Sequence, residues 1–375
     1  MRGLGLTACL PRDYADGVFL GRAQGPDGPH VIVLQGGRIH DITGEASTVS
    51  GAVARRVFGG GSDIGAIEDG LPEGWDLLSP IDIQCVKACG VTFAVSAIER
   101  VIEERARGDA AAAVEIRKGL EATIGAGIRA VVPGSDEAMA LKQALIAQGM
   151  WSQYLEVAIG PDAEVFSKSP VLSTVGHGAP IGVRSDSSWN NPEPEVVLVV
   201  DPAGEVVGAT LGNDVNLRDF EGRSALLLSK AKDNTASCAI GPFIRLFGNG
   251  FGIDDVRQAE VELVVEGTDN FRMEGTNRMT EISRDPLELV RQTMSEHSYP
   301  DGFVLFCGTL FAPVQDRDEP GGGFTHKVGD VVTIRSERLG TLTNTVTTSR
   351  DAPKWQVGIG AFMRNLAERG LVEKA

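Results

Sequence analysis

The sequence predicts an α+β protein of two domains, a small β-rich unit in residues 1–75 and a larger domain in residues 80–375. Its 375 residues exceed the ~150 that one domain typically needs. The 47 glycines and 18 prolines, within ordinary contents of 42% apolar and 23% charged residues, indicate a folded chain with many tight turns. Short β-type runs fill most of the second half, and helical spacing occurs in only a few separate segments.

The N-terminal unit is predicted from one hairpin and one linker. Residues 31–34 and 38–42 are β-branched runs on either side of Gly36-Gly37, which is typical of a hairpin with a glycine turn. Three glycines at 59–61 and a proline-bounded stretch at 72–80 then predict a linker.

The remaining helices and strands are predicted from the spacing of apolar residues and from the turn residues between them. Apolar residues at helical spacing predict four helices: 97–118 ending at Gly119, one opening at Ser135, 286–297 and 355–369. Short apolar runs between turn residues predict six strands: 195–200, 206–211, 260–265, 303–306, 331–335 and 339–346.

The charge balance excludes two classes of partner. The chain has 51 acidic and 35 basic side chains, a formal net charge of −16. Such a field repels phosphate backbones and anionic membrane surfaces, so we expect no nucleic acid and no membrane partner. The same field tolerates a divalent cation.

Cysteine usage and the N-terminus predict a cytoplasmic protein. The five cysteines form no even framework, which is typical of reduced thiols, and we expect Cys85 and Cys89 to be buried small residues rather than zinc ligands. No apolar run reaches the ~18 residues of a membrane helix. Residues 6–9 mimic a lipoprotein cleavage box, but the apolar stretch before them is far shorter than the ~7–15 residues of a signal core.

Three carboxylates are predicted to converge at one hairpin. Two β-branched runs flank the Pro/Gly turn at 201–204, and pairing about that turn gives partner numbers that sum to roughly 405–407. Glu193 and Glu195 are two apart on a strand, so both project from the same face. Asp214 then arrives beside Glu193 from the partner strand.

Three close carboxylates repel one another unless a cation lies between them. Oxygen ligands of this kind suit Mg²⁺, with Mn²⁺ or Ca²⁺ as substitutes, and leave positions open for water or substrate. The simpler alternative is an acidic hairpin rim that faces solvent, and geometry alone favours that alternative.

A wider pattern of residues favours the metal site over the solvent-facing rim. The chain resembles the fumarylacetoacetate hydrolase superfamily over residues 80–350 in Glu193-x-Glu195, Asn213-Asp214, Arg218-Asp219 and Lys232, and also in segments 164–168 and 329–344. The resemblance implies a mixed β-sandwich roll as the catalytic domain, with the small β-rich domain before it. It also implies that Glu193, Glu195 and Asp214 hold the metal, that Lys232 lies in the active site, and that the protein is a homodimer or homotetramer.

One departure from the pattern separates the branches of the superfamily. Its hydrolases carry a histidine that activates water in the segment matching residues 85–93, and none of the five histidines here falls in that segment. Residues 90–93, 190–195 and 237–242 instead resemble the branch that dehydrates 2-keto-3-deoxy pentonates.

Dehydration of a 2-keto acid needs a Lewis acid and groups that move protons. Lys232 and Glu164 are the candidate proton-transfer residues, with a surface lysine and an exposed strand of alternating charge as the simpler alternatives. Lys168 and Thr309 are candidate substrate-binding residues, although turn chemistry explains Thr309 equally well. Arg218 and Asp219 are expected to brace the metal loop.

Three functional hypotheses follow. The first is a Mg²⁺-dependent lyase that converts a 2-keto-3-deoxy pentonate to 2,5-dioxopentanoate in pentose breakdown. The second is a superfamily hydrolase or decarboxylase of acylpyruvate-like diketo acids. The third is a metal- or ligand-binding protein without activity. The missing histidine favours the first over the second, and Lys232 disfavours the third.

Overall fold

The structure is a computed structural model that describes residues 6–374 except 108, 110–111, 114–115, 117–126, 129–130, 312, 314 and 320–322. The described α-helices are α1 (Val49–Arg55), α2 (Ala94–Ala106), α4 (Asp136–Ala147), α5 (Gln153–Ile159), α6 (Arg218–Glu221), α7 (Leu228–Lys232), α8 (Ile253–Arg257), α9 (Pro286–Met294) and α10 (Ile359–Glu368).

The described strands form three sheets. The first nine are β1 (Phe19–Gly25), β2 (Gly28–Gln35), β3 (Arg38–Asp41), β4 (Ser62–Ala66), β5 (Asp76–Leu77), β6 (Cys85–Gly90), β7 (Glu164–Ser169), β8 (Pro180–Val183) and β9 (Asn190–Asn191). The others are β10 (Pro194–Val200), β11 (Val206–Asp214), β12 (Asn216–Leu217), β13 (Cys238–Leu246), β14 (Glu260–Glu266), β15 (Arg272–Arg278), β16 (Phe303–Phe306), β17 (Val331–Ser336) and β18 (Gly340–Thr348).

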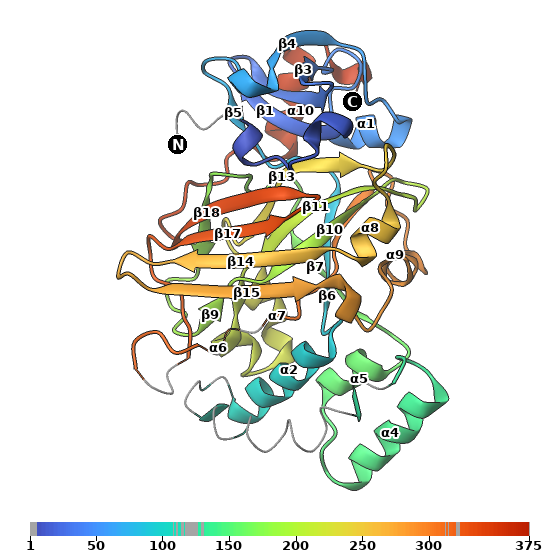
Figure 1. Cartoon of the computed structure of the whole chain (residues 1–375), viewed down its shortest axis with the longest axis vertical. Coiled ribbons are helices and arrows are strands. Elements are labelled where there is room, and N and C mark those ends of the chain that lie inside the picture. The colour runs from blue at the N-terminus through green and yellow to red at the C-terminus, as the bar shows by residue number, and fades with distance from the viewer. Residues whose placement is uncertain are drawn as a thin grey trace.

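Two of these sheets pack face to face (Figure 1). The larger runs β4-β3-β2-β1-β13-β11-β10-β16-β6-β7, with β5 beside β1, and the smaller runs β15-β14-β17-β18-β8. The β16–β6 and β18–β8 pairs are parallel and the other pairs in both sheets are antiparallel. The third sheet is the short β9–β12 pair. The mixed, two-layered fold confirms the predicted fold class.

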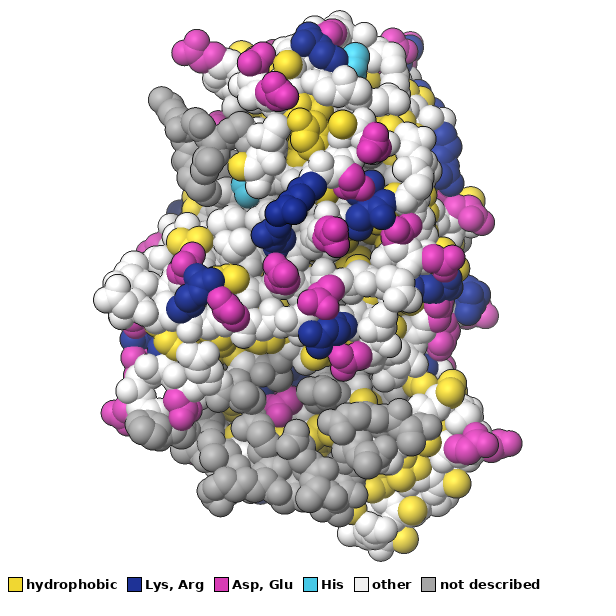
Figure 2. All heavy atoms as spheres, in the orientation of Figure 1, with side chains coloured by type: hydrophobic (Ala, Val, Ile, Leu, Met, Phe, Trp, Pro, Cys, Tyr) yellow, Lys and Arg dark blue, Asp and Glu magenta, His cyan; other side chains and the backbone are white. Residues whose placement is uncertain are grey.

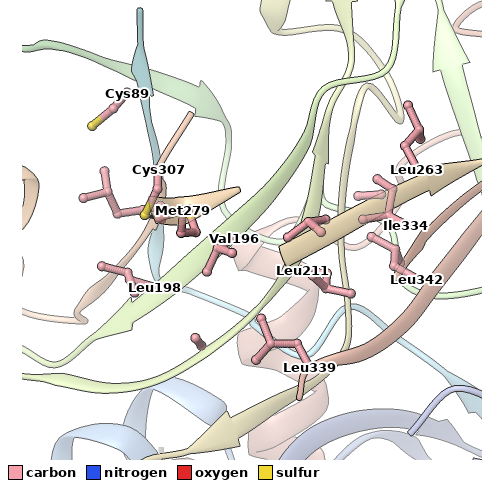
Figure 3. Close-up of a cluster of buried hydrophobic side chains, with 14 of the residues drawn as sticks. Cys89, Val196, Leu198, Leu211, Leu263, Met279, Cys307, Ile334, Leu339 and Leu342 are labelled. Carbon is pink, nitrogen blue, oxygen red and sulfur yellow. Dashed lines mark hydrogen bonds between the residues drawn. The ribbon is translucent and has the colours of Figure 1, made fainter. Parts of the chain in front are cut away.

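Strand β10 is buried on both faces, which explains its unbroken apolar run. Val196 and Leu198 face the smaller sheet, where they pack with Leu263 of β14 and Ile334 of β17 (Figure 3). Val197 alternates to the opposite face and joins a second core with β13 and α1. The central hairpin is therefore clamped between two apolar layers, and its ends are held in position.

The N-terminal strands continue the larger sheet rather than forming one of their own. β1 pairs with β13 through Phe19 opposite Arg245 and Leu20 opposite Ile244. Helix α10, from the other end of the sequence, lies beside these strands (Figure 1), and Asn365 Nδ2 donates to the Asp27 carbonyl oxygen at 2.7 Å. A division of the chain at residues 75–80 stays a prediction.

Most of the predicted elements are present with small shifts in their ends. The N-terminal hairpin turns at Gly36 and Gly37, both with positive φ (56° and 79°), as a two-residue turn requires. Ser135 caps α4 by accepting a hydrogen bond from the Ala138 amide at 3.1 Å.

The helix expected over 97–118 differs most from its prediction. It begins earlier, at Ala94, and ends at Ala106, because Arg107 adopts a left-handed conformation (φ 52°) as its C-cap. Much of the remaining predicted stretch lies outside the described residues. Helices α1 and α5 were not predicted, since each is only seven residues long and offers little periodicity.

Acidic and basic side chains are mixed on the visible face of the molecule (Figure 2). On the face shown in Figure 2, basic side chains lie among acidic ones rather than in a patch of their own. None of the described helices has the length and apolar character needed to cross a membrane. All five cysteines carry free thiols. The prediction that Cys85 and Cys89 are both buried is confirmed for Cys89 and wrong for Cys85, which is exposed.

Candidate active site

The three predicted carboxylates meet at the ends of β10 and β11. Pro194 lies opposite Asn213 and Glu195 opposite Gly212, so partner numbers sum to 407 as predicted. The Asp214 amide donates to the Glu193 carbonyl oxygen at 3.1 Å, which places these two residues side by side. One carboxylate oxygen from each of the three residues lies within 4.8 Å of the others.

This cluster is buried, not a solvent-facing rim. Glu193, Glu195 and Asp214 are only 4%, 2% and 2% exposed. Burial, followed by repulsion from Asp214 and Glu193, holds the pKa of Glu195 well above its ordinary value. Its Oε2 also accepts a hydrogen bond from the Gly308 amide at 2.6 Å, which fixes its direction. Hard oxygen ligands gathered at this spacing fit a divalent cation of the Mg²⁺ type.

Two buried lysines neutralise part of the acidic charge. Lys232 Nζ, at the end of α7, donates to Glu193 Oε2 and lies 3.1 Å from Asp214 Oδ2. Burial lowers the pKa of Lys232, but the carboxylates around it outweigh burial and raise that pKa above its ordinary value. Lys232 is therefore charged in this arrangement.

Lys168 supports the cluster from β7. It is fully buried, and its Nζ lies 2.7 Å from Asp214 Oδ1, 2.5 Å from the Lys232 carbonyl oxygen and 3.3 Å from the Val215 carbonyl oxygen. Burial raises the pKa of Asp214, yet Lys168 and Lys232 together pull it below its ordinary value. The ammonium of Lys168 holds the Asp214 carboxylate and the end of α7 together.

A pocket opens beside the carboxylates and brings most of the predicted residues together. It encloses about 530 Å³, counting its solvent-open part. Of the seven candidate catalytic, metal-binding and substrate-binding residues, six line it: Glu164, Glu193, Glu195, Asp214, Lys232 and Thr309. Arg218, expected to brace the loop, lines it as well. Lys168 does not line it. None of the five histidines, all within the described part of the chain, lines it either.

Glu164 and Thr309 approach the pocket from the larger sheet and from the loop after β16. Burial, followed by repulsion from Glu221, raises the pKa of Glu164 to about 7, so this carboxyl is partly protonated near neutral pH. Thr309 is 8% exposed, and its Oγ1 accepts a hydrogen bond from the Phe311 amide at 3.1 Å. That bond is the turn contact anticipated as the simpler alternative for Thr309.

Helix α2 forms the opposite wall with a buried network of charges. Arg100 lies 2.7 Å from Glu193 Oε1, 2.7 Å from Glu103 Oε2 and 2.8 Å from Glu221 Oε2. Arg218 binds Glu103 at 2.6 Å and stacks over the ring of Trp189 with its guanidinium carbon 4.5 Å from the ring centroid. These pairs tie α2 and α6 to the carboxylate cluster.

Arg218 and Asp219 brace the loop as expected, by different contacts. Arg218 holds α2 through the network above. Asp219 accepts hydrogen bonds from the Ser187 hydroxyl at 2.8 Å and the Ser188 amide at 2.9 Å, before β9.

Sequence reasoning missed the charged residues of α2. The helix was predicted from its apolar side, which carries Ile98, Val101 and Ile102, and no role was predicted for the charges elsewhere on it. Glu99 and Glu103, one position further round, are nevertheless buried at 7% and 2% exposed. A glutamate four residues before another, beside Arg100, was the available signal, but the same spacing occurs on exposed helices.

Comparisons with known proteins agree with this geometry. The C-terminal domain of fumarylacetoacetate (FAA) hydrolase matches residues 147–347, more than half of the chain. A protein from Haloferax volcanii named "probable 2-keto-3-deoxyxylonate dehydratase" is 35% identical over 199 residues, 53% of this chain and 65% of the relative. The 2-dehydro-3-deoxy-D-arabinonate dehydratase of Saccharolobus solfataricus is 34% identical over 182 residues, 48% of this chain and 57% of the relative.

A solved structure shows the same fold. The crystal structure of a 2-keto-3-deoxy-D-arabinonate dehydratase, complexed with magnesium and 2,5-dioxopentanoate, aligns with a TM-score of 0.61 over 88% of this chain and 98% of the other, at 22% identity. The matches to the two curated relatives span less than two-thirds of the length of each. The match to the family domain and the shared fold lead to one conclusion: this chain belongs to the fumarylacetoacetate hydrolase family.

Proposed function

We propose that this protein is a Mg²⁺-dependent lyase that removes water from a 2-keto-3-deoxy pentonate and yields 2,5-dioxopentanoate. One observation carries the proposal: a buried carboxylate triad, an ammonium and a partly protonated carboxyl share a pocket that no histidine lines among the described residues. The names of the two curated relatives and the ligands of the solved structure support the same substrate class.

Glu193, Glu195 and Asp214 would hold the metal. Mg²⁺ bound by these residues supplies a Lewis acid for the keto and carboxylate oxygens of a 2-keto acid. The gathered oxygens suit this ion, since they are hard ligands at close spacing.

Lys232 and Glu164 divide the proton transfers in this proposal. Water loss requires removal of a C3 proton and protonation of the departing C4 hydroxyl, and both groups line the pocket where these atoms would lie. A carboxyl with a pKa of about 7 is partly ionised near neutral pH, so Glu164 can take the C3 proton, while the Lys232 ammonium can donate a proton to the departing hydroxyl. The proton held by Glu164 is then available for the later tautomerisation. Lys168 would act through Asp214 and the α7 carbonyl, as a positioning residue.

The first test is turnover by the purified protein. With Mg²⁺, we expect one of the D- or L-configured 2-keto-3-deoxy pentonates to lose water, seen by NMR as the aldehyde proton of 2,5-dioxopentanoate. An acylpyruvate should remain uncleaved. Cleavage of the acylpyruvate without loss of water from either pentonate would instead establish the hydrolase alternative.

Glu195→Gln tests the metal assignment. The variant should lose turnover while it keeps the fold, because Gln removes one negative charge from a crowded cluster. Full activity of this variant after chelation and return of Mg²⁺ would refute the metal assignment.

Assembly as a homodimer or homotetramer is a separate proposal, and a single 39.6 kDa species in light scattering would refute it.

A further inference from the structure

Two buried amides in the pocket lack the hydrogen bonds that buried amides normally make. Asn216 of β12 is 1% exposed, and neither its Nδ2 nor its Oδ1 has a hydrogen-bond partner among the described residues. Asn191 of β9, 3% exposed, donates from Nδ2 to the Pro192 carbonyl oxygen at 2.9 Å, but within the same part of the chain its Oδ1 has no partner. The two residues lie opposite each other in the β9–β12 pair, and both line the pocket.

Two other buried asparagines, Asn277 and Asn344, are used as structural clamps. Asn277 donates to the carbonyl oxygens of Pro194 and Gly308 and accepts from the Leu310 amide. Asn344 donates to the carbonyl oxygens of Gly176 and Ala179. An unsatisfied buried amide destabilises a fold, so the contrast at Asn216 indicates a group that serves a ligand.

The unsatisfied atoms specify the chemistry of that ligand. They comprise two carbonyl oxygens, which only accept, and one amide nitrogen, which only donates. A carboxylate would satisfy the nitrogen but would face the two oxygens with further negative charge. A hydroxyl both donates and accepts, so it can accept from the Asn216 nitrogen and donate its single hydrogen to the Asn191 oxygen.

Resting on the proposed dehydration, we propose that Asn216 and Asn191 bind the C5 hydroxyl of the substrate and select for it. The C4 hydroxyl leaves and needs a proton donor, which a neutral amide is not. The C5 oxygen stays on the molecule and becomes the aldehyde oxygen of the product, to which the Asn216 N–H can still donate.

The experiment measures binding without turnover. Two ligands, 5-hydroxy-2-oxopentanoate and 2-oxopentanoate, differ only in the C5 hydroxyl, and neither has a C4 hydroxyl to lose. Calorimetry with Mg²⁺ should give the wild-type protein about tenfold tighter binding of the hydroxylated ligand, the effect of one hydrogen bond to an otherwise unsatisfied group. Asn216→Leu, similar in shape, should abolish this preference and leave the Kd of 2-oxopentanoate unchanged.

Thr210→Val is the matched control. Thr210 Oγ1 is also buried and has no partner in the part of the chain that the structure describes, but Thr210 does not line the pocket, so its variant should keep the preference. Asn216→Ala provides a second test if leucine blocks both ligands. The fraction of each ligand that is in its open-chain form is a property of the ligand and is the same for every variant. A change in the ratio of the two Kd values between variants therefore comes from the protein.

The outcomes separate this inference from the proposed function. A preference that survives in both Asn216 variants, or that is absent from the wild type, overturns the role of the amides. Binding of neither keto acid overturns both proposals. A preference that depends on Asn216, in a protein that dehydrates no pentonate, upholds hydroxyl recognition and refutes the dehydration alone.

Discussion

The raised pKa of Glu164 predicts a pH-dependent loss of stability that one substitution removes. In the unfolded chain this carboxyl ionises near 4.5, whereas burial and Glu221 raise its pKa in the fold to about 7. The folded protein therefore binds the extra proton between these values. Its contribution to stability is fully present below pH 4.5 and is lost as the pH rises through 7.

The size of the effect follows from the shift in pKa. The difference of about 2.5 units corresponds to about 3 kcal/mol at about 1.4 kcal/mol per unit. Because the carboxyl is partly accessible from the pocket, solvent weakens this penalty, and we expect ~1–3 kcal/mol. Glu164→Gln is neutral at every pH, so it should be more stable than the wild type by this amount at pH 8 and roughly equal to it at pH 4.5.

Urea unfolding in EDTA at pH 4.5, 6, 7 and 8 measures this difference. Chelation keeps divalent cations from lowering the pKa, and contributions from other titrating groups cancel between the two proteins. A difference in unfolding free energy that is constant across the series would refute the raised pKa. A variant that loses stability toward pH 8 would show that ionised Glu164 has a stabilising partner.

Four further predictions concern the carboxylates and the two lysines beside them. Lys232→Met should lower kcat by ~10²–10⁴-fold, with substrate binding retained, and near wild-type turnover would leave this lysine a structural role. The same variant should lose ~3–5 kcal/mol of unfolding free energy in EDTA, because Glu193 and Asp214 lose their ammonium partner, and Mg²⁺ should restore most of it. Lys168→Met should lower the melting temperature with little change in KM, whereas a raised KM at an unchanged melting temperature would assign it to substrate binding. Glu195→Gln should show no calorimetric Mg²⁺ binding, and wild-type affinity would refute its role as a ligand.

Periodicity of two along the chain was sufficient to bring the three carboxylates together, although by itself it favoured a solvent-facing rim over a buried site. The turn at 201–204 sets the pairing of β10 with β11, and alternation then places Glu193 and Glu195 on one face with Asp214 beside them. These relations are local, so tertiary packing did not alter them. The family pattern and the mixed fold could also be predicted from the residues.

The surroundings of that centre depended on contacts distant in sequence. Glu193 meets Arg100 across 93 residues, and Arg218 meets Glu103 across 115, and no spacing rule links such positions. The sequence placed Lys168 with the substrate, while its ammonium lies against Asp214 and two carbonyl oxygens behind the pocket.

The burial of α2 charges and the unsatisfied amides were likewise decided by the tertiary structure. A glutamate on a helix is in most cases solvated, and only the packing of α2 against the pocket shows that Glu103 is buried. The sequence shows that Asn216 is polar; which of its hydrogen bonds are made depends on every neighbour in space. Local alternation and turn chemistry thus determined which three carboxylates come together. Desolvation and long-range charge pairing decided their protonation and the shape of the pocket, because both exist only once the chain is folded.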